Sequence, residues 1–219
     1  MLLILWNQGW KLDLNLFLAK AVEAWRELFP AFAVDTAQLT SDLSALLRQR
    51  ITSQLEDDGY AADLVQAVAG GTVPTKRLLR DPLDVRVRIQ LLRGLRDQGR
   101  LTAVQAVVQR ASRLAEKGDL PLDVLSSTEV VDPSRFESAS EKGLFDATKR
   151  LNPLAESGAY QELCDVLVES TPALEAFFDG DESVMVMADD SALRMNRLNL
   201  LGVLRNQAAV FAQFELIQS

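Results

Sequence analysis

The 219-residue sequence contains no histidine and a single cysteine, Cys164. Without histidine, it can form neither a Ser-His-Asp or Cys-His catalytic group nor a histidine-ligated metal site, so catalysis would have to use carboxylates or lysine. One cysteine excludes an internal disulfide framework and a cysteine-cluster zinc site, and it is typical of a reducing compartment. We therefore expect a cytoplasmic protein with no catalytic residue set and no metal site.

The sequence also lacks a long apolar run. Residues 1–6 are apolar, but no basic segment precedes them and Asn7 and Gln8 follow, so they fit neither a signal peptide nor a membrane span. They resemble part of a helix cut in the middle, so we expect the chain to be a piece of a longer protein and place no membrane among its partners. The sequence has no phosphate-binding loop, dinucleotide fingerprint or nucleophile elbow either.

Apolar residues recur at helical spacing along most of the chain, and no alternating strand pattern persists. The sequence therefore predicts an all-α fold. Asp13 is the expected N-cap of the first helix, Gly99 and Gly118 are expected C-caps, and Pro172 is expected to kink or restart a helix. The expected helices cover residues 14–28, 42–58, 60–70, 83–98, 102–117, 135–156, 159–179 and 189–216, with a Gly-Pro-rich joint over 70–82 and a loop or linker over 119–134.

Charge is distributed unevenly along the chain. The net charge is −8, but residues 73–117 hold eleven Lys and Arg against four Asp and Glu, a net +7, which leaves −15 for the rest. Arginine binds phosphate in a bidentate manner and stacks on bases, so this strip indicates a surface for a polyanion. The alternative is a solvated helix face neutralised by acidic neighbours. The net negative charge of the rest of the chain argues against nonspecific binding along DNA. It does not argue against a single binding site that fits the shape of an RNA.

Within the basic strip, the spacing of four arginines places them on one face of a helix, while four apolar residues are expected to line the core face. The arginines are Arg86, Arg93, Arg96 and Arg100, and the apolar residues are Leu83, Val87, Leu91 and Leu95.

Two acidic groups, residues 56–59 and 179–182, could bind Mg²⁺ or Ca²⁺ through carboxylates, but neither has EF-hand spacing. We interpret both as solvated helix-end loops. The phenylalanines at 177, 178, 211 and 214 have core spacing, and residues 184–187 are expected to form a buried connector.

The segment from Asp189 to Leu198 has two interpretations. Asp190 and Arg194 are spaced for a capped helix with an internal ion pair. Alternatively, Arg194, Asn196 and Arg197 could contact RNA, since these residue types bind phosphates and base edges.

Five strings of this sequence carry a family resemblance. They are FFD at 177–179, VMVMADD at 184–190, LRMNRLNLL at 193–201, LWNQGWKLDLN at 5–15 and LEDDGYAADLVQAV at 55–68. In order and over essentially the whole chain, they resemble the C-terminal region of the bacterial glycyl-tRNA synthetase beta subunit. Two departures stand out. Residues 109–113 retain only Arg110 of the Lys-Arg-x-x-Asn run that is common in the family, and residues 180–183 lengthen a joint.

The resemblance implies that residues 1–219 form a single helical-bundle region, similar to the anticodon-binding domain of arginyl-tRNA synthetases, which holds the anticodon arm of glycine tRNA. It implies a glycine-tRNA ligase in which a catalytic alpha subunit uses ATP and Mg²⁺, within an assembly of two alpha and two beta subunits. This segment would be non-catalytic and bind no cofactor or DNA. Its location would be the cytoplasm, or an organellar matrix or stroma in a plant-type relative.

We predict that nine residues contact RNA: Arg86, Arg93, Arg96, Arg100, Arg110, Arg113, Arg194, Asn196 and Arg197. Glycine anticodons share two cytosines, whose Watson-Crick edges a carboxylate, Asn or Arg could read. The alternative function is a helical protein-interaction and assembly module whose basic strip docks an acidic partner, such as the rest of the same synthetase.

Overall fold

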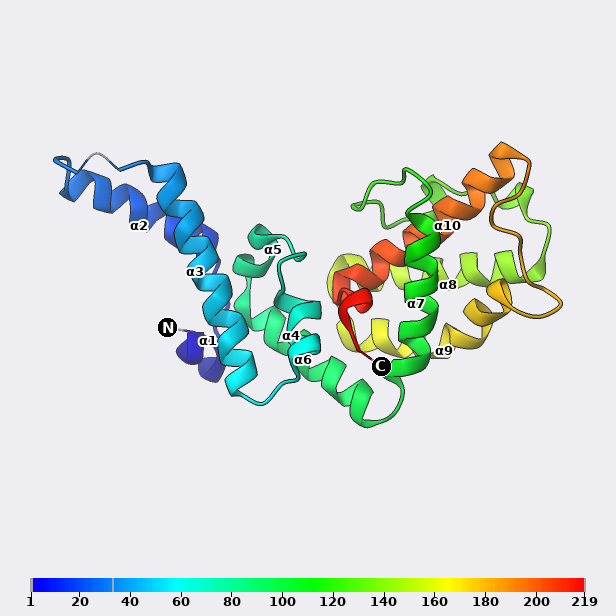
Figure 1. Cartoon of the computed structure of the whole chain (residues 1–219), viewed down its shortest axis with the longest axis horizontal. Coiled ribbons are helices and arrows are strands. Elements are labelled where there is room, and N and C mark those ends of the chain that lie inside the picture. Colours follow the sequence, from blue (N-terminus) through cyan, green and yellow to red (C-terminus); the bar gives the residue numbers. More distant parts are fainter. Residues whose placement is uncertain (1, 33, 219) are drawn as a thin grey trace. The chain divides into compact units, whose positions relative to one another are not determined.

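The computed structural model describes residues 2–32 and 34–218, and over these ranges the chain forms ten α-helices, three short 3-10 helices and no strand (Figure 1). The predicted all-α fold is confirmed. The described residues divide into two compact units, residues 2–32 and 34–93 with 216–218 (unit 1) and residues 94–215 (unit 2). Met1, the first residue of the apolar run, lies outside the described ranges. No helix within those ranges is long and apolar enough to span a membrane.

Unit 1 contains α1 (Leu2–Gln8), α2 (Leu14–Leu28), α3 (Thr36–Asp57), α4 (Ala62–Ala69), α5 (Thr75–Arg80) and most of α6 (Pro82–Asp97). The Asp13 carboxylate accepts hydrogen bonds from the backbone N–H groups of Asn15 (2.8 Å) and Leu16 (3.3 Å), so it caps α2 as predicted. The second helix begins six residues earlier than predicted. Asp35 explains this start, because its carboxylate accepts from Ala37 N at 2.9 Å and Gln38 N at 3.1 Å.

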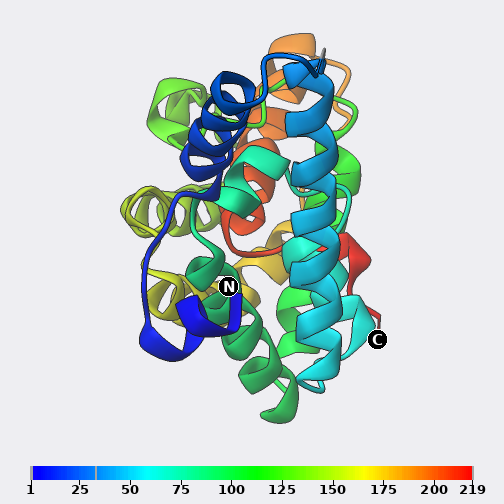
Figure 2. The same cartoon turned by 90° about the vertical axis from the view of Figure 1, so that its left-hand side faces the viewer.

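Helices α2 and α3 pack side by side as a hairpin, and α3 also packs on α4 and α5 (Figures 1 and 2). The turn between α4 and α5 is held by Arg48 of α3. Its guanidinium donates to the carbonyl oxygens of Ala69 (3.1 Å), Gly70 and Val73 (2.6 Å) and to Thr75 Oγ1 (2.7 Å). The predicted Gly-Pro-rich joint over 70–82 contains the short helix α5, which the sequence did not indicate.

Unit 2 is built on α7 (Leu101–Ala115), α8 (Ala139–Ser157), α9 (Tyr160–Phe178) and α10 (Ser191–Phe211). Helix α8 packs on α9, α10 packs on α7 and α8, and α7 packs on α9. The expected loop over 119–134 includes two 3-10 turns, η1 (Ser127–Glu129) and η2 (Pro133–Arg135), and η3 (Phe214–Leu216) follows α10. Helix α9 continues through Pro172, so the predicted restart is absent.

Two predictions about the core were wrong. In α6 the buried apolar residues are Val85, Ile89, Leu92 and Leu95, whereas Val87 is 41% exposed. The buried face is therefore rotated relative to the predicted one, and it includes Arg88, whose Nε donates to Asp84 Oδ2 at 2.8 Å. Residues 184–187 do not form a buried connector, because Met185 is 75% exposed and only Val186 is buried. Three of the four predicted core phenylalanines are buried and Phe178 is half-buried.

Burial should make Cys164 unreactive in the folded protein. The side chain lies on α9 in the core of unit 2, and burial raises its thiol pKa to about 12, with a further contribution from the Asp165 charge. Because the thiolate is the reactive form, we expect a colorimetric disulfide reagent at neutral pH to react extremely slowly with the native chain. Addition of denaturant should release one thiol per chain. Rapid stoichiometric reaction without denaturant would contradict this burial.

Candidate nucleic-acid interface

Arg197, one of the predicted RNA contacts, lies inside unit 2 and pairs with Glu141 of α8. Its Nε donates to Glu141 Oε1 at 2.7 Å, and the two side chains are 5% and 0% exposed. A second donor, Nη2, reaches Glu137 Oε2 at 2.8 Å, and Nη1 reaches the Met185 carbonyl oxygen at 3.1 Å. Burial alone would lower the pKa of Arg197, but hydrogen bonds to Glu141 and Glu137 outweigh it and hold the pKa above its usual value.

Glu141 has a second role at the start of α8. Its Oε2 accepts from the backbone N–H groups of Glu137 (2.7 Å) and Ser138 (3.0 Å), and Ser138 completes a capping box. The same carboxylate therefore caps one helix and neutralises an arginine of another.

Asn196, also predicted to contact RNA, instead joins α10 to the loop before α8. Its side chain accepts from Asp132 N at 2.7 Å and donates to Asp132 O at 3.1 Å. Three further amides of α10 donate to the carbonyls of the same loop: Asn199 to Val130, Asn206 to Pro121 and Val124, and Gln207 to Leu125. Because these groups satisfy buried backbone oxygens, the polar string of α10 holds the 120–132 loop in place.

Arg194 does not form the predicted ion pair with Asp190. Its Nη1 donates to the carbonyl oxygen of Ala188 at 2.7 Å. Asp190 does cap α10 as predicted, with its carboxylate accepting from Ala192 N (2.8 Å) and Leu193 N (2.9 Å). These backbone hydrogen bonds, from Leu193 first and then Ala192, lower the pKa of Asp190.

The predicted α6 arginines in unit 1 lie over aromatic rings. The guanidinium carbon of Arg86 is 5.4 Å from the ring centroid of Trp6, and that of Arg93 is 5.2 Å from Tyr60. Trp6 is itself fixed by a hydrogen bond from its indole N–H to the Pro82 carbonyl oxygen at 2.9 Å. Of these two arginines, Arg93 is exposed and Arg86 is half-buried.

The remaining predicted arginines of the strip belong to unit 2. Arg96 lies near the end of α6, Arg100 directly precedes α7, and Arg110 and Arg113 lie on α7. Arg96 is half-buried, and Arg100 reaches Asp165 at 3.4 Å. Arg110 pairs with Asp179 at 2.5 Å and lies 4.6 Å from the Phe178 ring centroid. Arg113 is exposed.

Arg110, Arg113 and Lys117 form the α7 basic face, since their spacing of three and four residues places them on one side of the helix and the turn that follows it. All three are exposed. No ion pair of the described residues involves Arg113 or Lys117. The face therefore joins two of the predicted residues, Arg110 and Arg113, to an exposed lysine that was not predicted, and all three are accessible to a polyanion.

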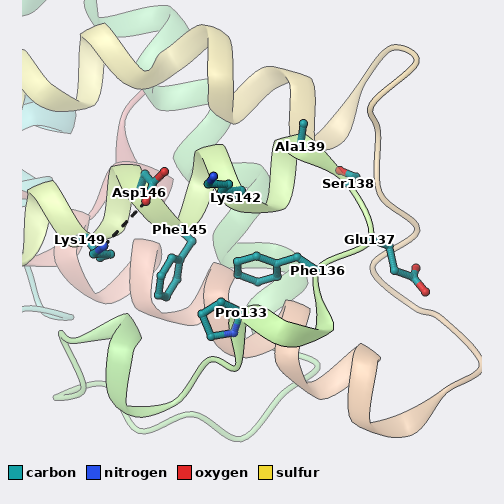
Figure 3. Close-up of a pocket in the computed structure, with 9 residues that line it drawn as sticks. All are labelled: Pro133, Phe136, Glu137, Ser138, Ala139, Lys142, Phe145, Asp146 and Lys149. Carbon is teal, nitrogen blue, oxygen red and sulfur yellow. Dashed lines mark ion pairs between the residues drawn. The ribbon is translucent and has the colours of Figure 1, made fainter.

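An open pocket of about 560 Å³ lies beside α8, and the sequence analysis did not identify it. We call it the α8 pocket. Its walls combine aromatic, basic and acidic side chains: Pro133, Phe136, Glu137, Ser138, Ala139, Lys142, Phe145, Asp146 and Lys149 (Figure 3). Lys142, Phe145 and Lys149 were visible as an i, i+3, i+7 pattern on one helix face, but Phe136 comes from the preceding loop. No group of three or more potential metal-ligating side chains occurs within residues 2–32 and 34–218.

Comparison with known proteins relates this chain to one kind of protein. It is 40% identical over 220 residues to the glycine–tRNA ligase beta subunits of a Picosynechococcus species and of Acaryochloris marina. It is 31% identical over 219 residues to that of Aliivibrio salmonicida. Each alignment covers 98% of this chain, and no family model matches it.

The chain spans about 30% of the length of these relatives. It is thus homologous to a segment of the glycine–tRNA ligase beta subunit, and the resemblance stated from the sequence is confirmed. The roles of the nine predicted RNA contacts, and the extent of the region as a single domain, stay predictions.

Removal of Arg197 should destabilise unit 2, because it would leave Glu141 buried without its cationic partner. We expect Arg197→Ala to lower the free energy of unfolding by about 3–5 kcal/mol. Arg113→Ala, which removes an exposed arginine, should change it by less than about 0.5 kcal/mol. Urea denaturation followed by circular dichroism measures both. If Arg197→Ala kept wild-type stability and lost RNA affinity, the arginine would instead be an RNA contact.

Proposed function

We propose that this chain is the tRNA-binding part of a glycine–tRNA ligase beta subunit and that it holds the anticodon arm of glycine tRNA. The observation that carries this proposal is the similarity to such beta subunits over 98% of the chain. The relatives' name identifies a ligase that acts on tRNA, and the chain contributes a helical scaffold with an exposed basic face. Its role would be to support glycyl-tRNA synthesis for translation in the cytoplasm.

In this proposal the chain positions tRNA, and the chemistry takes place elsewhere in the enzyme. The catalytic alpha subunit would use ATP and Mg²⁺ to activate glycine, in an assembly of two alpha and two beta subunits. The absence of histidine supports a non-catalytic role, because the chain cannot supply the commonest general base. The partners would be glycine tRNA, the remainder of the beta subunit and the alpha subunit.

The α7 basic face supplies the physical basis for binding the RNA backbone. Guanidinium and ammonium groups form charge-assisted hydrogen bonds with phosphate oxygens, and such contacts position a protein on RNA without reading its sequence. Arg113 and Lys117 are exposed and would lose no internal ion pair when they bind phosphate. Arg110 would have to share its guanidinium with Asp179, although its stacking on Phe178 also keeps it in place.

A second candidate function, an assembly module, is favoured by apolar surface on unit 1. Leu28 is 73% and Phe32 63% exposed at the tip of the α2–α3 hairpin. Phe29 and Phe32 form an aromatic cluster with Trp25, with ring centroids 5.6 and 5.9 Å from that of Trp25. An apolar pocket of about 520 Å³ adjoins the cluster. Exposed apolar surface of this kind marks contact with protein, so unit 1 would dock against another part of the ligase.

Anticodon dependence tests the proposed function directly. We expect the chain to bind a glycine tRNA transcript more tightly than the same transcript with its two shared anticodon cytosines replaced, because base contacts add to backbone contacts. Equilibrium binding at moderate salt measures the difference. Equal affinity would refute anticodon readout, and no binding to either transcript would favour the assembly module.

Neutralising the α7 basic face should weaken tRNA binding and reduce its salt dependence. For Arg113→Gln/Lys117→Gln we expect the slope of log affinity against log salt to fall by about 2, one for each lost phosphate contact. The matched control is Lys20→Gln/Arg26→Gln, which removes the same charge from exposed positions on α2. If both double variants had the same effect, net charge rather than the α7 basic face would explain the binding.

A further inference from the structure

We propose that the α8 pocket holds one unstacked base of the bound RNA, with a preference for a base that carries an exocyclic amine, while Lys142 and Lys149 contact neighbouring phosphates. This inference rests on the proposed function, because it gives that function a base-reading site that none of the nine predicted residues lines. Three features of the pocket support the inference: its aromatic walls, its two lysines and Asp146, a carboxylate with no arginine partner in the part of the chain that the structure describes.

The pocket offers apolar walls of the right kind for a base. Phe136 and Phe145 have ring centroids 5.5 Å apart with an interplanar angle of 66°, and Pro133 lies beside Phe136 (Figure 3). Phe145 is 8% exposed and belongs to the core, whereas Phe136 is half-buried and leaves part of its ring open. A half-buried ring next to a proline gives a base a surface on which to stack.

The two lysines lie on the same face of α8 as Phe145, seven residues apart. Both are exposed, and Lys142 forms no ion pair among the residues that the structure describes. Lys149 is 3.9 Å from Asp146 and 5.5 Å from the centroid of the Phe145 ring. Both ammonium groups line the same pocket as Phe136, so they are available to the phosphates of a strand whose base stacks on that ring.

The carboxylates of the pocket have different roles. Glu137 is 66% exposed, but its Oε2 is 2.8 Å from Arg197 Nη2, so this carboxylate is held by a guanidinium that it shares with Glu141. Asp146 is 56% exposed and has only the long contact with Lys149. An ionised carboxylate accepts hydrogen bonds and donates none, so Asp146 can accept from the exocyclic amine of cytosine, adenine or guanine. Uracil offers it only the N3 N–H, which lies between two carbonyl oxygens that the carboxylate repels. This asymmetry predicts the base preference.

Buried hydrogen bonds also fix the backbone on both sides of Phe136 in the wall of the pocket. Asn196 fixes the backbone of Asp132, which adjoins Pro133, and Glu141 fixes the backbone of Glu137 and Ser138 on the other side of Phe136. Both anchors use buried side chains. Phe136 is thus presented on a short segment secured at both ends, so little ordering of the loop is needed when a base binds.

The test measures the affinity of the whole chain for short, fluorescently labelled homopolymers of cytidine and of uridine. The affinity for glycine tRNA is then measured in the same way. The wild-type chain should bind the cytidine homopolymer more tightly. Phe136→Leu should weaken that binding about fivefold or more, since stacking on an aromatic ring contributes about 1–3 kcal/mol per base. Asp146→Ala should remove the preference for cytidine over uridine, and Lys142→Gln/Lys149→Gln should lower the salt dependence for both homopolymers and for tRNA.

The matched control for the lysine variant is Lys20→Gln/Arg26→Gln, which also removes two exposed cations but from α2 rather than from the pocket. Thermal unfolding of each variant identifies any loss of fold. Because the lysine variant changes only exposed side chains, we expect it to stay folded. If the α7 variants weaken tRNA binding and the pocket variants do not, the pocket proposal is overturned and the proposed function stands. Equal wild-type affinity for the two homopolymers also overturns it. If the wild-type chain binds no RNA, both proposals fail together.

Discussion

The ion pair between Arg197 and Glu141 is the interaction on which the architecture of unit 2 depends. Both groups are removed from solvent, so each needs the other to offset the cost of burying a charge. The remaining donors and acceptors of the pair bind Glu137, Ser138 and Met185. One contact thereby fixes α10, the beginning of α8 and the connector before α10 in a single register.

The polar residues of α10 extend the same arrangement along the helix. An irregular loop packed on a helix exposes carbonyl oxygens that need donors, and asparagine and glutamine supply them without adding charge. The loop after α7 is long for a connection between packed helices, yet the amides of α10 give it one defined path. That path ends at Phe136, so the surface that we propose binds RNA is shaped by side chains that lie beneath it.

The sequence predicts the helices that have a cap residue or a long apolar period. It does not predict a very short helix, or which of two apolar faces is buried. Asp13 and the glycine after α6 mark helix ends by local chemistry, and both were identified. Helix α5 has six residues, too few to show a period. In α6, apolar residues occur in two registers, and only the contacts of unit 1 select the one that contains Ile89.

The same limit applies to the candidate interface. Arginine and asparagine are the residues expected at RNA, but they are also the residues that satisfy buried carboxylates and carbonyls, and spacing alone does not separate these uses. Arg197 and Asn196 have internal partners, whereas Arg113 has solvent around it. The α8 pocket was missed because its open ring, Phe136, lies in a loop without periodicity.

Intrinsic tryptophan fluorescence distinguishes unit 1 from unit 2. The chain's three tryptophans, Trp6, Trp10 and Trp25, all belong to unit 1, and unit 2 contains none. Trp6 is buried while Trp10 is 58% exposed, so tryptophan emission reports the unfolding of unit 1 through one indole in its core and one on its surface. Helical circular dichroism reports both units. Whether the two signals change together on denaturation measures how strongly the units cooperate, without any added dye.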